Sequence, residues 1–569
     1  MGQTCLWPCL PMNEKMKRTF ISALLMIWGI CLWNSSLETA AAAGIKPGES
    51  WSSVNAHGGC VVYADGWYYW FGECRSKNKS NGISCYRSKD LMSWTEQAKA
   101  VTPTGTMTDD NADIANGRTL ERPKVIFNEK TGKWVMWIHW ENGNDYGLAK
   151  VAVCESDKVS GPYKLVSVFR PNGNDSRDQT LFLDDDGTAY HIYSTGMNTN
   201  TNCEPLADDY LSPLETVNTQ LKGRRYEAAA LFKAGETYFG LFSGCTGWDP
   251  NPGRCMWTQD LMGEWEAPAD FKASDGSTGT NFCTDTGKDN SYKSQSNFVF
   301  QLPDRKNAFI YMGDRWNSSN IESSKHVWLP LSVRSGYPRV RWYDEWDLSV
   351  FDTMYRYKRV KTLTEGTECY LIEKFSDRVV SKPKTSLTLE DDGNANHIFV
   401  FHTTTNPYEY KIANVEGNFM TSVYGTLRWQ AESDNQSQVW RLILEEDGYY
   451  RIENADDGRC LSVSGNSTIA GTNIFLTEAS KTIHQSFALY FDSDVHADYE
   501  EADIFSKAYK EENRRKMEEQ AEWISGIEDS PTLSQPVQEN MYDIGGRKVV
   551  HKKGKRGIVI MNGRKMIIP

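Results

Sequence analysis

Between residues 54 and 360 the same pattern of polar and apolar positions returns five times. Each copy is a short turn rich in Asp, Gly, Lys or Asn, followed by a strand in which aromatic and aliphatic residues alternate. Turn residues between segments of period two predict β-hairpins. The predicted strands cover residues 67–71, 134–139, 189–194, 238–243 and 308–313.

These five hairpins follow one another at intervals of about 50 to 70 residues, with no helical pattern between them. Such spacing favours radial repetition over a β-sandwich, and the natural count is a five-bladed β-propeller over residues 44–360. The innermost strands of a propeller converge on one axial cleft. Residues far apart in the sequence can therefore meet there.

A different repeat occupies residues 361–492. Tyr370, Tyr410 and Tyr450 each lie in the first strand of a unit, at a spacing of 40 residues, and the second and third units end in Gln-x-Trp and Gln-x-Phe. Three such units resemble a ricin-type β-trefoil, the carbohydrate-binding module of many secreted glycosidases. Ser462 stands where that family usually has a sugar-binding Asp, so both a sugar-binding and a purely structural trefoil remain open.

The two ends of the chain carry segments of another kind. Residues 1–43 contain a basic start, an apolar run and a small-residue cleavage site, which predicts a signal peptide in which Met16 is an alternative initiator. The protein is therefore expected to be exported to the periplasm, the cell surface or the medium. We expect a solvated helical linker over residues 493–530, and residues 531–569 resemble the short β tails of exported proteins. That tail is either a sorting or anchoring element or a plain hairpin.

Composition narrows the choice of partner. The net charge of -13 argues against nucleic acid, and the 20 Trp and 27 Tyr suit both all-β sheets and sugar-stacking clefts. After the signal segment no apolar run is long enough to span a bilayer. Export permits disulfides, and Cys245 to Cys255 is the first candidate bridge. The cysteines lack metal-ligand spacing, so no cofactor is expected, although scattered histidines leave room for one structural ion.

Glu227 is the leading candidate for chemistry. It lies between Arg225 and an apolar run that ends at Phe232, so its carboxyl should be partly desolvated. Burial disfavours the charged form and raises the pKa, which suits a general acid, whereas an arginine beside it would act in the opposite direction. The alternative is an ion pair at a strand end. Further carboxylates and amides at predicted blade starts are Glu73, Glu121, Asp178 and Gln295.

Such a set fits glycoside hydrolysis, which needs an acid on the leaving oxygen. Inversion also needs a second group that holds water, about 6.5 to 9.5 Å from the acid. Several ordered motifs between residues 50 and 345 resemble glycoside hydrolase family 43, and within it the exo-β-1,3-galactanase branch. The motifs start at Ala56 (AHGG), Gly66 (GWYYWFGE), Glu121 (ERPK), Asp184 (DDDGTAY), Tyr226 (YEA), Ser243 (SGCTGW) and Val327 (VWLPL).

This resemblance implies an inverting enzyme with a base Asp in the first blade, an orienting Asp in the second and an acid Glu in the third. The present chain has no Asp beside His57, and it has Glu121 and Glu227 at the other two positions. The galactanase branch shares these departures and places a glutamine in the base role, here Gln295. An amide is a poor base, so Gln295 would orient the water or act through its imidic tautomer.

The same resemblance implies a terminal sugar subsite, with Glu121 reading an axial hydroxyl. Trp248 is either core or a stacking platform for galactose. The residues implied to contact the sugar are Glu73, Tyr146, Asp178, Asn198 and Thr246.

The sequence thus predicts an exo-acting, inverting glycoside hydrolase that releases galactose from β-1,3-galactan, the backbone of arabinogalactan. Two alternatives stay open at this point. One is a family 43 arabinosidase or another galactosidase. The other is a non-catalytic carbohydrate-binding propeller, because the usual base Asp is missing.

Overall fold

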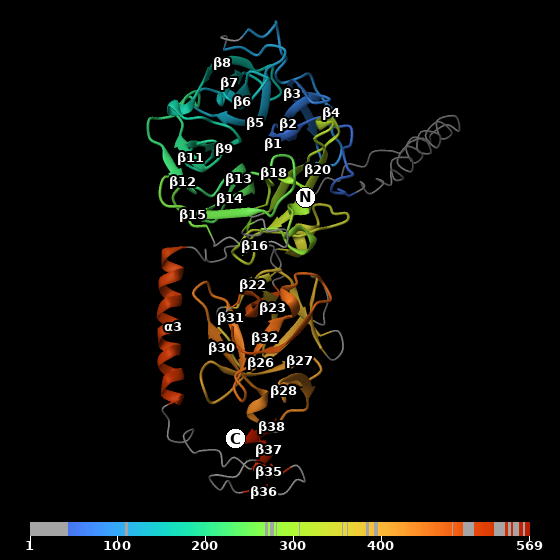
Figure 1. The fold of residues 1–569 in the computed structure, drawn as a ribbon, viewed down its shortest axis with the longest axis vertical. Helices are drawn as coiled ribbons and strands as arrows, with labels where there is room; N and C mark the ends of the chain where they lie inside the picture. Colours follow the sequence, from blue (N-terminus) through green and yellow to red (C-terminus); the bar gives the residue numbers. More distant parts are fainter. Residues whose placement is uncertain are drawn as a thin grey trace, which may run out of the picture.

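The computed structural model describes residues 44–492 apart from short internal gaps, one helix near the C-terminus and the strands of the last 30 residues. The signal peptide predicted over residues 1–43 lies outside the described residues. Two lobes make up most of the molecule, a propeller above and a trefoil below, and the helix α3(Lys507–Glu528) lies beside the trefoil (Figure 1).

The upper lobe is a five-bladed β-propeller, as the periodicity predicts. Each predicted hairpin strand is the second strand of a blade, and the blades surround a common centre (Figure 1). The sheet of the fourth blade has three strands. The blades are β1(His57–Ala64), β2(Trp67–Ser76), β3(Lys79–Ser88) and β4(Thr95–Glu96); β5(Thr119–Asn128), β6(Lys133–Glu141), β7(Lys150–Ser156) and β8(Lys164–Phe169); β9(Gln179–Leu183), β10(Ala189–Thr195), β11(Asn200–Pro205) and β12(Asn218–Gln220); β13(Tyr226–Ala234), β14(Thr237–Gly244) and β15(Arg254–Thr258); β18(Gln295–Gln301), β19(Phe309–Arg315), β20(Lys325–Ser332) and β21(Arg339–Val340).

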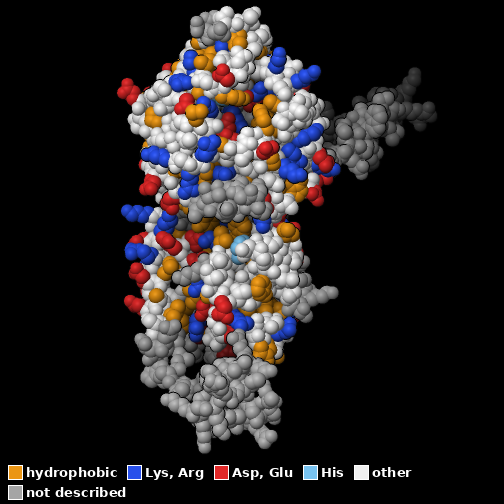
Figure 2. Space-filling view, in the orientation of Figure 1, with side chains coloured by type: hydrophobic (Ala, Val, Ile, Leu, Met, Phe, Trp, Pro, Cys, Tyr) orange, Lys and Arg blue, Asp and Glu red, His pale blue; other side chains and the backbone are white. Residues whose placement is uncertain are grey.

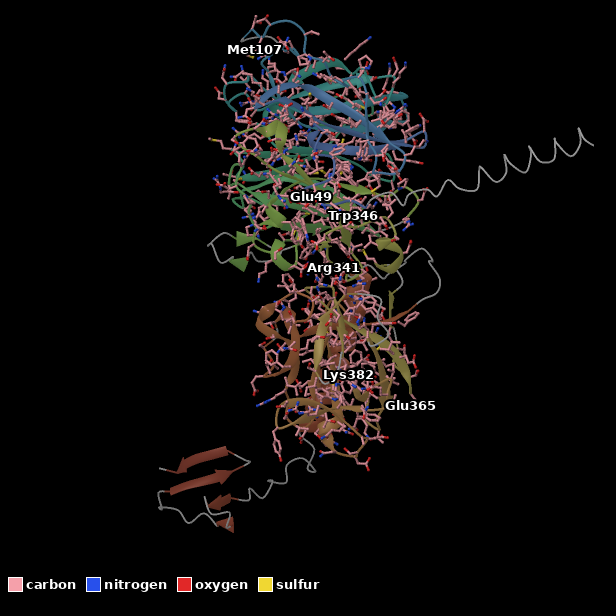
Figure 3. The ribbon with its side chains drawn as sticks, turned by 90° about the vertical axis from the view of Figure 1, so that its right-hand side faces the viewer. Glu49, Met107, Arg341, Trp346, Glu365 and Lys382 are labelled. Carbon is pink, nitrogen blue, oxygen red and sulfur yellow. The ribbon has the colours of Figure 1, made fainter. Side chains whose placement is uncertain are left out.

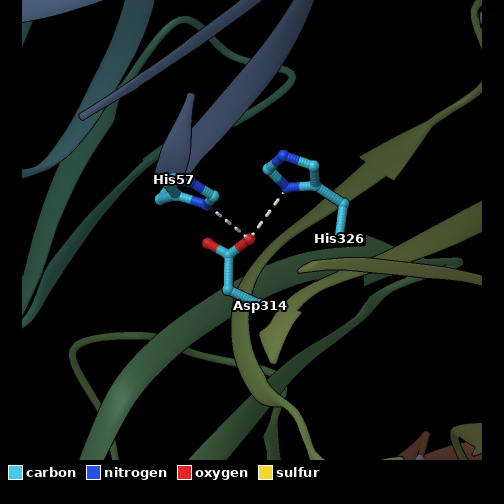
Figure 4. A group of neighbouring side chains, drawn as sticks. All are labelled: His57, Asp314 and His326. Atoms are coloured by element: carbon cyan, nitrogen blue, oxygen red, sulfur yellow. Dashed lines mark hydrogen bonds and ion pairs between the residues drawn. The ribbon is translucent and has the colours of Figure 1, made fainter. Parts of the chain in front are cut away.

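Three buried side chains join the first blade to the last. Asp314 on β19 accepts hydrogen bonds from His57 Nδ1 at 3.3 Å and from His326 Nδ1 at 2.9 Å, both through Oδ1 (Figure 4). Its other oxygen accepts from the backbone N–H of Gly58 at 2.6 Å. Charge-assisted bonds in a buried setting are strong, so this cluster closes the ring.

The lower lobe is a β-trefoil, in agreement with the 40-residue repeat. Tyr370, Tyr410 and Tyr450 lie on β23, β27 and β31, the first strand of each unit, and the core includes the fully buried Trp440. The strands are β22(Tyr357–Arg359), β23(Thr367–Glu373), β24(Val379–Ser381), β25(Leu387–Glu390), β26(Ile398–Thr403), β27(Glu409–Asn414), β28(Phe419–Val423), β29(Thr426–Gln430), β30(Val439–Leu444), β31(Tyr450–Asn454), β32(Cys460–Val463), β33(Asn473–Thr477) and β34(Ser486–Asp492).

Buried polar contacts join the trefoil to the edge of the fifth blade. Arg334 and Asp377 have fully buried side chains and form an ion pair at 3.1 Å. The hydroxyl of Tyr490 donates to the carbonyl of Arg334 at 2.7 Å, and that of Tyr449 donates to the carbonyl of Ser335 at 2.6 Å. Arg341 lies at the same junction between the lobes (Figure 3). The lobes therefore share a buried polar interface.

The helix near the C-terminus, α3(Lys507–Glu528), differs from the expected solvated linker. Its Gln520 is buried, donates to the carbonyl of Leu442 at 2.6 Å and accepts from the N–H of Leu444 at 2.9 Å. One glutamine thus satisfies backbone groups on β30, which holds the helix against the trefoil. Beyond the helix lie the tail strands β35(Met541–Asp543), β36(Lys548–Val549), β37(Gly557–Met561) and β38(Arg564–Ile568).

Two further expectations concern cysteines and membranes. The predicted Cys245–Cys255 bridge is wrong, since the two sulfur atoms do not form a disulfide. Cys255 pairs in register with Leu241 on β14, whereas Cys245 follows the end of that strand and bonds the carbonyl of Arg225 at 3.2 Å. Among the described helices, none combines the length and apolar character needed to cross a membrane.

Candidate active site

β-Bulges on the innermost strands shape the centre of the propeller. The pairing registers of β1, β5, β13 and β18 each shift near the start of the strand. Arg122 and Ala228 take positive φ values of 52° and 56° within two of these shifts, which is uncommon for residues with a side chain. A bulge re-aims the neighbouring side chains. Glu121 and Glu227, which precede the two residues, line the central pocket.

The registers also correct two sequence expectations. Glu73 does not start a blade, because it lies on β2 and pairs with His57 of β1. Glu227 lies on β13, the first strand of the fourth blade rather than the third. Asp178 directly precedes β9 and so takes the corresponding position in the third blade. A bulge leaves no period-two signal, so the sequence could not separate first from second strands here.

A cavity of about 330 Å³ opens among these strands. A hollow containing acidic side chains is visible near the centre of the propeller face (Figure 2). Eight of the nine predicted site residues line the cavity. The lining residues are Glu73, Glu121, Arg122, His139, Tyr146, Arg177, Asp178, Asn198, Glu227, Gly247, Trp248, Gln295 and Trp316.

Thr246 is the predicted contact that does not line this cavity. Its hydroxyl donates to the carbonyl of Asp249 at 2.5 Å and accepts from Asn251 Nδ2 at 2.7 Å. Both bonds stabilise the turn that carries Gly247 and Trp248. The residue therefore supports the rim of the cavity.

Glu227 is 8% exposed. Burial and the negative charge of Asp178 raise the pKa of Glu227 to about 7, against the opposing effects of Cys245, Arg122 and Arg254. The raised pKa agrees with the sequence expectation. The arginines that partly offset the rise are Arg122 and Arg254, which lie on other strands, and not the nearby Arg225 that the sequence suggested. A carboxyl of this kind holds its proton near neutral pH.

Gln295 contacts Glu227 directly. Its Nε2 donates to Glu227 Oε1 at 3.0 Å, and its Oε1 accepts from Arg122 Nη2 at 2.5 Å and from Trp316 Nε1 at 2.8 Å. This contact differs from the expected separation of about 6.5 to 9.5 Å between an acid and a group across the sugar. In this arrangement Gln295 lies beside the acid.

Glu121 has a different environment from Glu227. Its Oε1 accepts from Arg75 Nη2 at 2.7 Å and from the hydroxyl of Tyr146 at 2.9 Å, and its Oε2 lies 3.4 Å from His139 Nδ1. Burial alone would raise the pKa of Glu121, but the bonds and charges of His139 and Arg75 hold it well below its usual range. The two glutamates thus differ in charge near neutral pH, with Glu121 ionised.

His139 connects Glu121 to a loop of the second blade. Its Nε2 lies 3.2 Å from Glu141 Oε1, and Glu141 accepts from the backbone N–H groups of Leu148 and Ala149, each at 2.9 Å. Although burial opposes its charge, the bonds to the two glutamates raise the pKa of His139 to about 9. The imidazolium therefore anchors the loop that presents Tyr146.

Four residues that hold Glu121 and Gln295 in place were not singled out from the sequence as site residues. Arg75 and His139 fix Glu121, whereas Arg122 and Trp316 fix Gln295. Arg122 belongs to the quoted ERPK motif, so a signal existed for it. Trp316 follows the end of β19, where the pattern gives no indication of its role.

Among the described residues, the cluster that closes the propeller has ligand atoms placed so that they could hold a metal ion. The ligand atoms of His57, Asp314 and His326 lie within 4.8 Å of one another. Each imidazole also points its Nε2 at a backbone carbonyl, that of Glu322 at 3.4 Å and that of Val54 at 2.9 Å. With both ring nitrogens of each histidine facing an oxygen, hydrogen bonds alone satisfy the group.

Comparison with known proteins now becomes informative. The model of glycosyl hydrolases family 43 matches residues 54–327. A solved GH43 β-1,3-galactosidase is 51% identical in sequence, covers 83% of this chain and 99% of its own, and superposes with a TM-score of 0.77. The chain belongs to glycosyl hydrolase family 43. The model of the ricin-type β-trefoil lectin domain matches residues 388–477.

Other solved relatives of this family 43 enzyme are more distant. A second GH43 β-1,3-galactosidase, solved with galactodeoxynojirimycin, is 34% identical over 54% of this chain and 100% of its own, with a TM-score of 0.49. An exo-β-1,3-galactanase from Clostridium thermocellum is 26% identical over 79% of this chain and 98% of its own, with a TM-score of 0.49. A search of curated proteins returned no match.

Proposed function

We propose that this family 43 enzyme is an exo-acting, inverting glycoside hydrolase that releases galactose from β-1,3-galactan. The single observation that carries the proposal is Glu227, a buried carboxyl with a pKa of about 7 at the centre of the propeller. A group that is protonated near neutral pH is suited to protonating a leaving oxygen. The solved β-1,3-galactosidase that is 51% identical supports the choice of sugar and linkage.

In the proposed reaction Glu227 donates its proton to the glycosidic oxygen as the bond to the anomeric carbon breaks. Water adds its hydroxyl to the opposite face of that carbon, and its remaining proton returns through solvent to Glu227. Positive charge develops on the sugar ring in such a transition state. The ionised Glu121 lines the pocket and favours that charge.

Roles for the other residues follow from their contacts. Glu121 is ionised and held by Arg75, so it is a fixed acceptor for a sugar hydroxyl. Tyr146 and Trp248 are about half exposed at the rim, 46% and 42%, and offer rings to the apolar face of galactose. Glu73, Asp178 and Asn198 are proposed to complete the terminal subsite.

Product analysis tests this proposal. Wild-type protein is incubated with β-1,3-galactan, arabinan and xylan, and the products are identified by chromatography and by NMR of the freshly released sugar. We expect galactose from the galactan alone, released first as the α-anomer. Release of arabinose or xylose, or of the β-anomer, would contradict the specificity or the inversion.

A non-catalytic sugar-binding propeller is the second candidate. The observation that favours it is the amide at position 295, where an ionisable base would be expected. Binding of galactan without any release of sugar would support this alternative. A retained, protonated Glu227 favours the enzyme, because a binding site has no need of an acid there.

We also propose a division of the chain into a propeller over residues 44–360, a trefoil over 361–492, a helical segment over 493–530 and a tail over 531–569. A signal peptide over residues 1–43, and thus export, fits a family that acts on polysaccharide outside the cell. Detection of the mature protein outside the cytoplasm, with its N-terminus sequenced, would test this part.

A further inference from the structure

The orientation of the Gln295 amide is fixed by its neighbours. Arg122 Nη2 and Trp316 Nε1 lie 2.5 and 2.8 Å from the same atom of this side chain. Guanidinium and indole nitrogens can only donate hydrogen bonds. The atom between them must therefore be the amide oxygen, and the amide nitrogen points at Glu227 Oε1, 3.0 Å away.

This arrangement restricts the chemistry of the amide. Two donors occupy the lone pairs of its oxygen. An imidic tautomer would place a proton on that same oxygen, where it would use one of the lone pairs that Arg122 and Trp316 occupy, and at least one of the two bonds would be lost. Leaving buried donors unpaired is costly. Gln295 is consequently held in the amide form, with its N–H groups as the active part.

We propose that Trp316 is a positioning residue, which keeps Gln295 as a hydrogen-bond donor to Glu227 and so fixes the orientation of the acid's carboxyl. This inference rests on the proposed role of Glu227 as the acid. Oε1 accepts from Gln295, and Oε2 accepts from Asn198 Nδ2 at 3.3 Å. Two amide donors thus hold the carboxyl in place before any sugar arrives.

Trp316 is itself packed against two rings and a guanidinium group. Its ring lies 5.4 Å from that of Trp248, edge to face, and 5.9 Å from that of His57. The guanidinium of Arg122 lies 5.8 Å from the centre of the same ring. A Phe at this position would keep an aromatic ring among these neighbours and remove the indole N–H together with its five-membered ring. Trp248→Phe makes the same change in ring size at the neighbouring position, so comparing the two variants separates hydrogen bonding from packing.

Arg122 is less suitable for such a test. Besides Gln295 it bonds Asn297 Oδ1 at 2.8 Å and the carbonyl of Ser296 at 3.0 Å, and it pairs with Asp178 at 3.2 Å. Its replacement would disturb several contacts together. The charged and titratable groups that act on Glu227, namely Asp178, Arg122, Arg254 and Cys245, all remain in place in Trp316→Phe. Any change in the pKa of Glu227 must then pass through Gln295.

The test measures kcat and KM on β-1,3-galactan across pH for wild type, Trp316→Phe, Gln295→Leu and the double variant. We expect Trp316→Phe to lower kcat by about tenfold to a hundredfold with KM within about twofold. The pKa of the alkaline limb should rise by about half a unit or more, because Glu227 loses a donor. Gln295→Leu should show the same pKa shift, and the double variant no further shift.

Trp248→Phe is the matched control, since it alters the neighbouring ring without touching Gln295. It should raise KM and leave the alkaline limb where it is. An unchanged or higher kcat in Trp316→Phe would overturn the proposal, because the reaction would then not depend on the hydrogen bond from Trp316 to Gln295. Additive pKa shifts in the double variant would also overturn it.

Failure of the proposed function would be distinguishable. If wild type releases no galactose, the reaction assignment fails, and crystal structures of wild type and Trp316→Phe decide the geometry instead. Retention of the Gln295–Glu227 contact in the variant structure would contradict the positioning role. Loss of that contact, with the ring packing intact, would support it.

Discussion

The side-chain amide of Gln295 donates to Glu227 across 3.0 Å, so the expected acid and its expected partner touch. Inverting enzymes usually separate these two groups by the width of a sugar and a water. The contact shows that Gln295 serves the acid directly. It also makes the properties of Glu227 the most testable part of the molecule.

Replacing Glu227 by Gln should remove nearly all turnover of β-1,3-galactan. The amide keeps the shape of the side chain but has no proton to donate at neutral pH. General acid catalysis contributes about a hundredfold to ten-thousandfold, and the loss should be at least of that order. Turnover is measured as galactose released, with circular dichroism as the control for folding. Unchanged turnover in a folded variant would refute the role of Glu227.

The activity of wild type should fall above about pH 7, because the acid must be protonated and the pKa of Glu227 is about 7. The same shift affects stability. Its pKa in the fold is raised from 4.5, so the folded state binds the proton more tightly and loses stability as pH rises from about 4.5 through 7. Glu227→Gln lacks this loss and should be more stable than wild type at pH 8, by about 3 kcal/mol. Thermal unfolding of both proteins at pH 4.5 and pH 8 checks the sign. A variant less stable than wild type at pH 8 would contradict it.

His139 should give a second loss of stability with rising pH, at higher pH than that of Glu227. Its pKa is raised from 6.5 to about 9, so the stabilisation is fully present below pH 6.5 and is lost as pH rises through 9. The difference between these two pKa values corresponds to about 3 kcal/mol of unfolding free energy. His139→Gln should lower the melting temperature at pH 6 and flatten its dependence between pH 6.5 and 9. A parallel fall of wild type and variant over that range would exclude the imidazolium as its cause.

The closure of the ring depends on Asp314. Burial would raise its pKa, but His57 and His326 hold the pKa of this carboxyl well below its usual range. Asp314→Asn removes the charge that the histidines face and should cost about 3 to 5 kcal/mol of stability. Because hydrogen bonds already satisfy the cluster, a chelator should leave the melting temperature of wild type unchanged. A fall that added divalent metal reverses would identify a metal site there.

The junction between the lobes can be probed at Asp377. Its partner Arg334 is fully buried, so Asp377→Asn removes the negative charge that this guanidinium faces and should cost about 3 to 5 kcal/mol. Asp208→Asn is the matched control, since it breaks the exposed pair with Lys130 and should change stability by less than about 1 kcal/mol. Urea unfolding measures both. Equal effects would mean that the junction contributes little.

Much of the fold could be predicted from the sequence because it repeats. The turn and alternating strand of each blade, and the Tyr-containing strand of each trefoil unit, are local signals that recur at fixed spacing. The position of α3 could not be predicted in this way, since it depends on Gln520 reaching two backbone groups of β30. A single buried glutamine leaves no periodic trace.

In the site, as in the fold, residues in local sequence patterns could be predicted and residues defined by distant contacts could not. Glu121 and Glu227 belong to the quoted motifs, and the structure brings them into one cavity with Asp178 and Gln295. Glu73 was placed on the wrong strand because a bulge is invisible to a period-two pattern. Trp316 was missed because its importance lies in one hydrogen bond to a residue 21 positions away. Contacts of this kind are a property of the folded chain alone.

The cluster of His57, Asp314 and His326 also bears on how the propeller folds. His57 and Asp314 are 257 positions apart in the sequence, so their contact closes a very long loop. Closing this loop costs conformational entropy before the hydrogen bonds of the cluster can form, and chains dominated by such distant contacts fold slowly. Four blades can form by local hairpin pairing as the chain is made. His326 of this cluster lies on β20, so the cluster is complete only once β20 has been synthesised. Until then the first and last blades of the newly made protein are not joined by it.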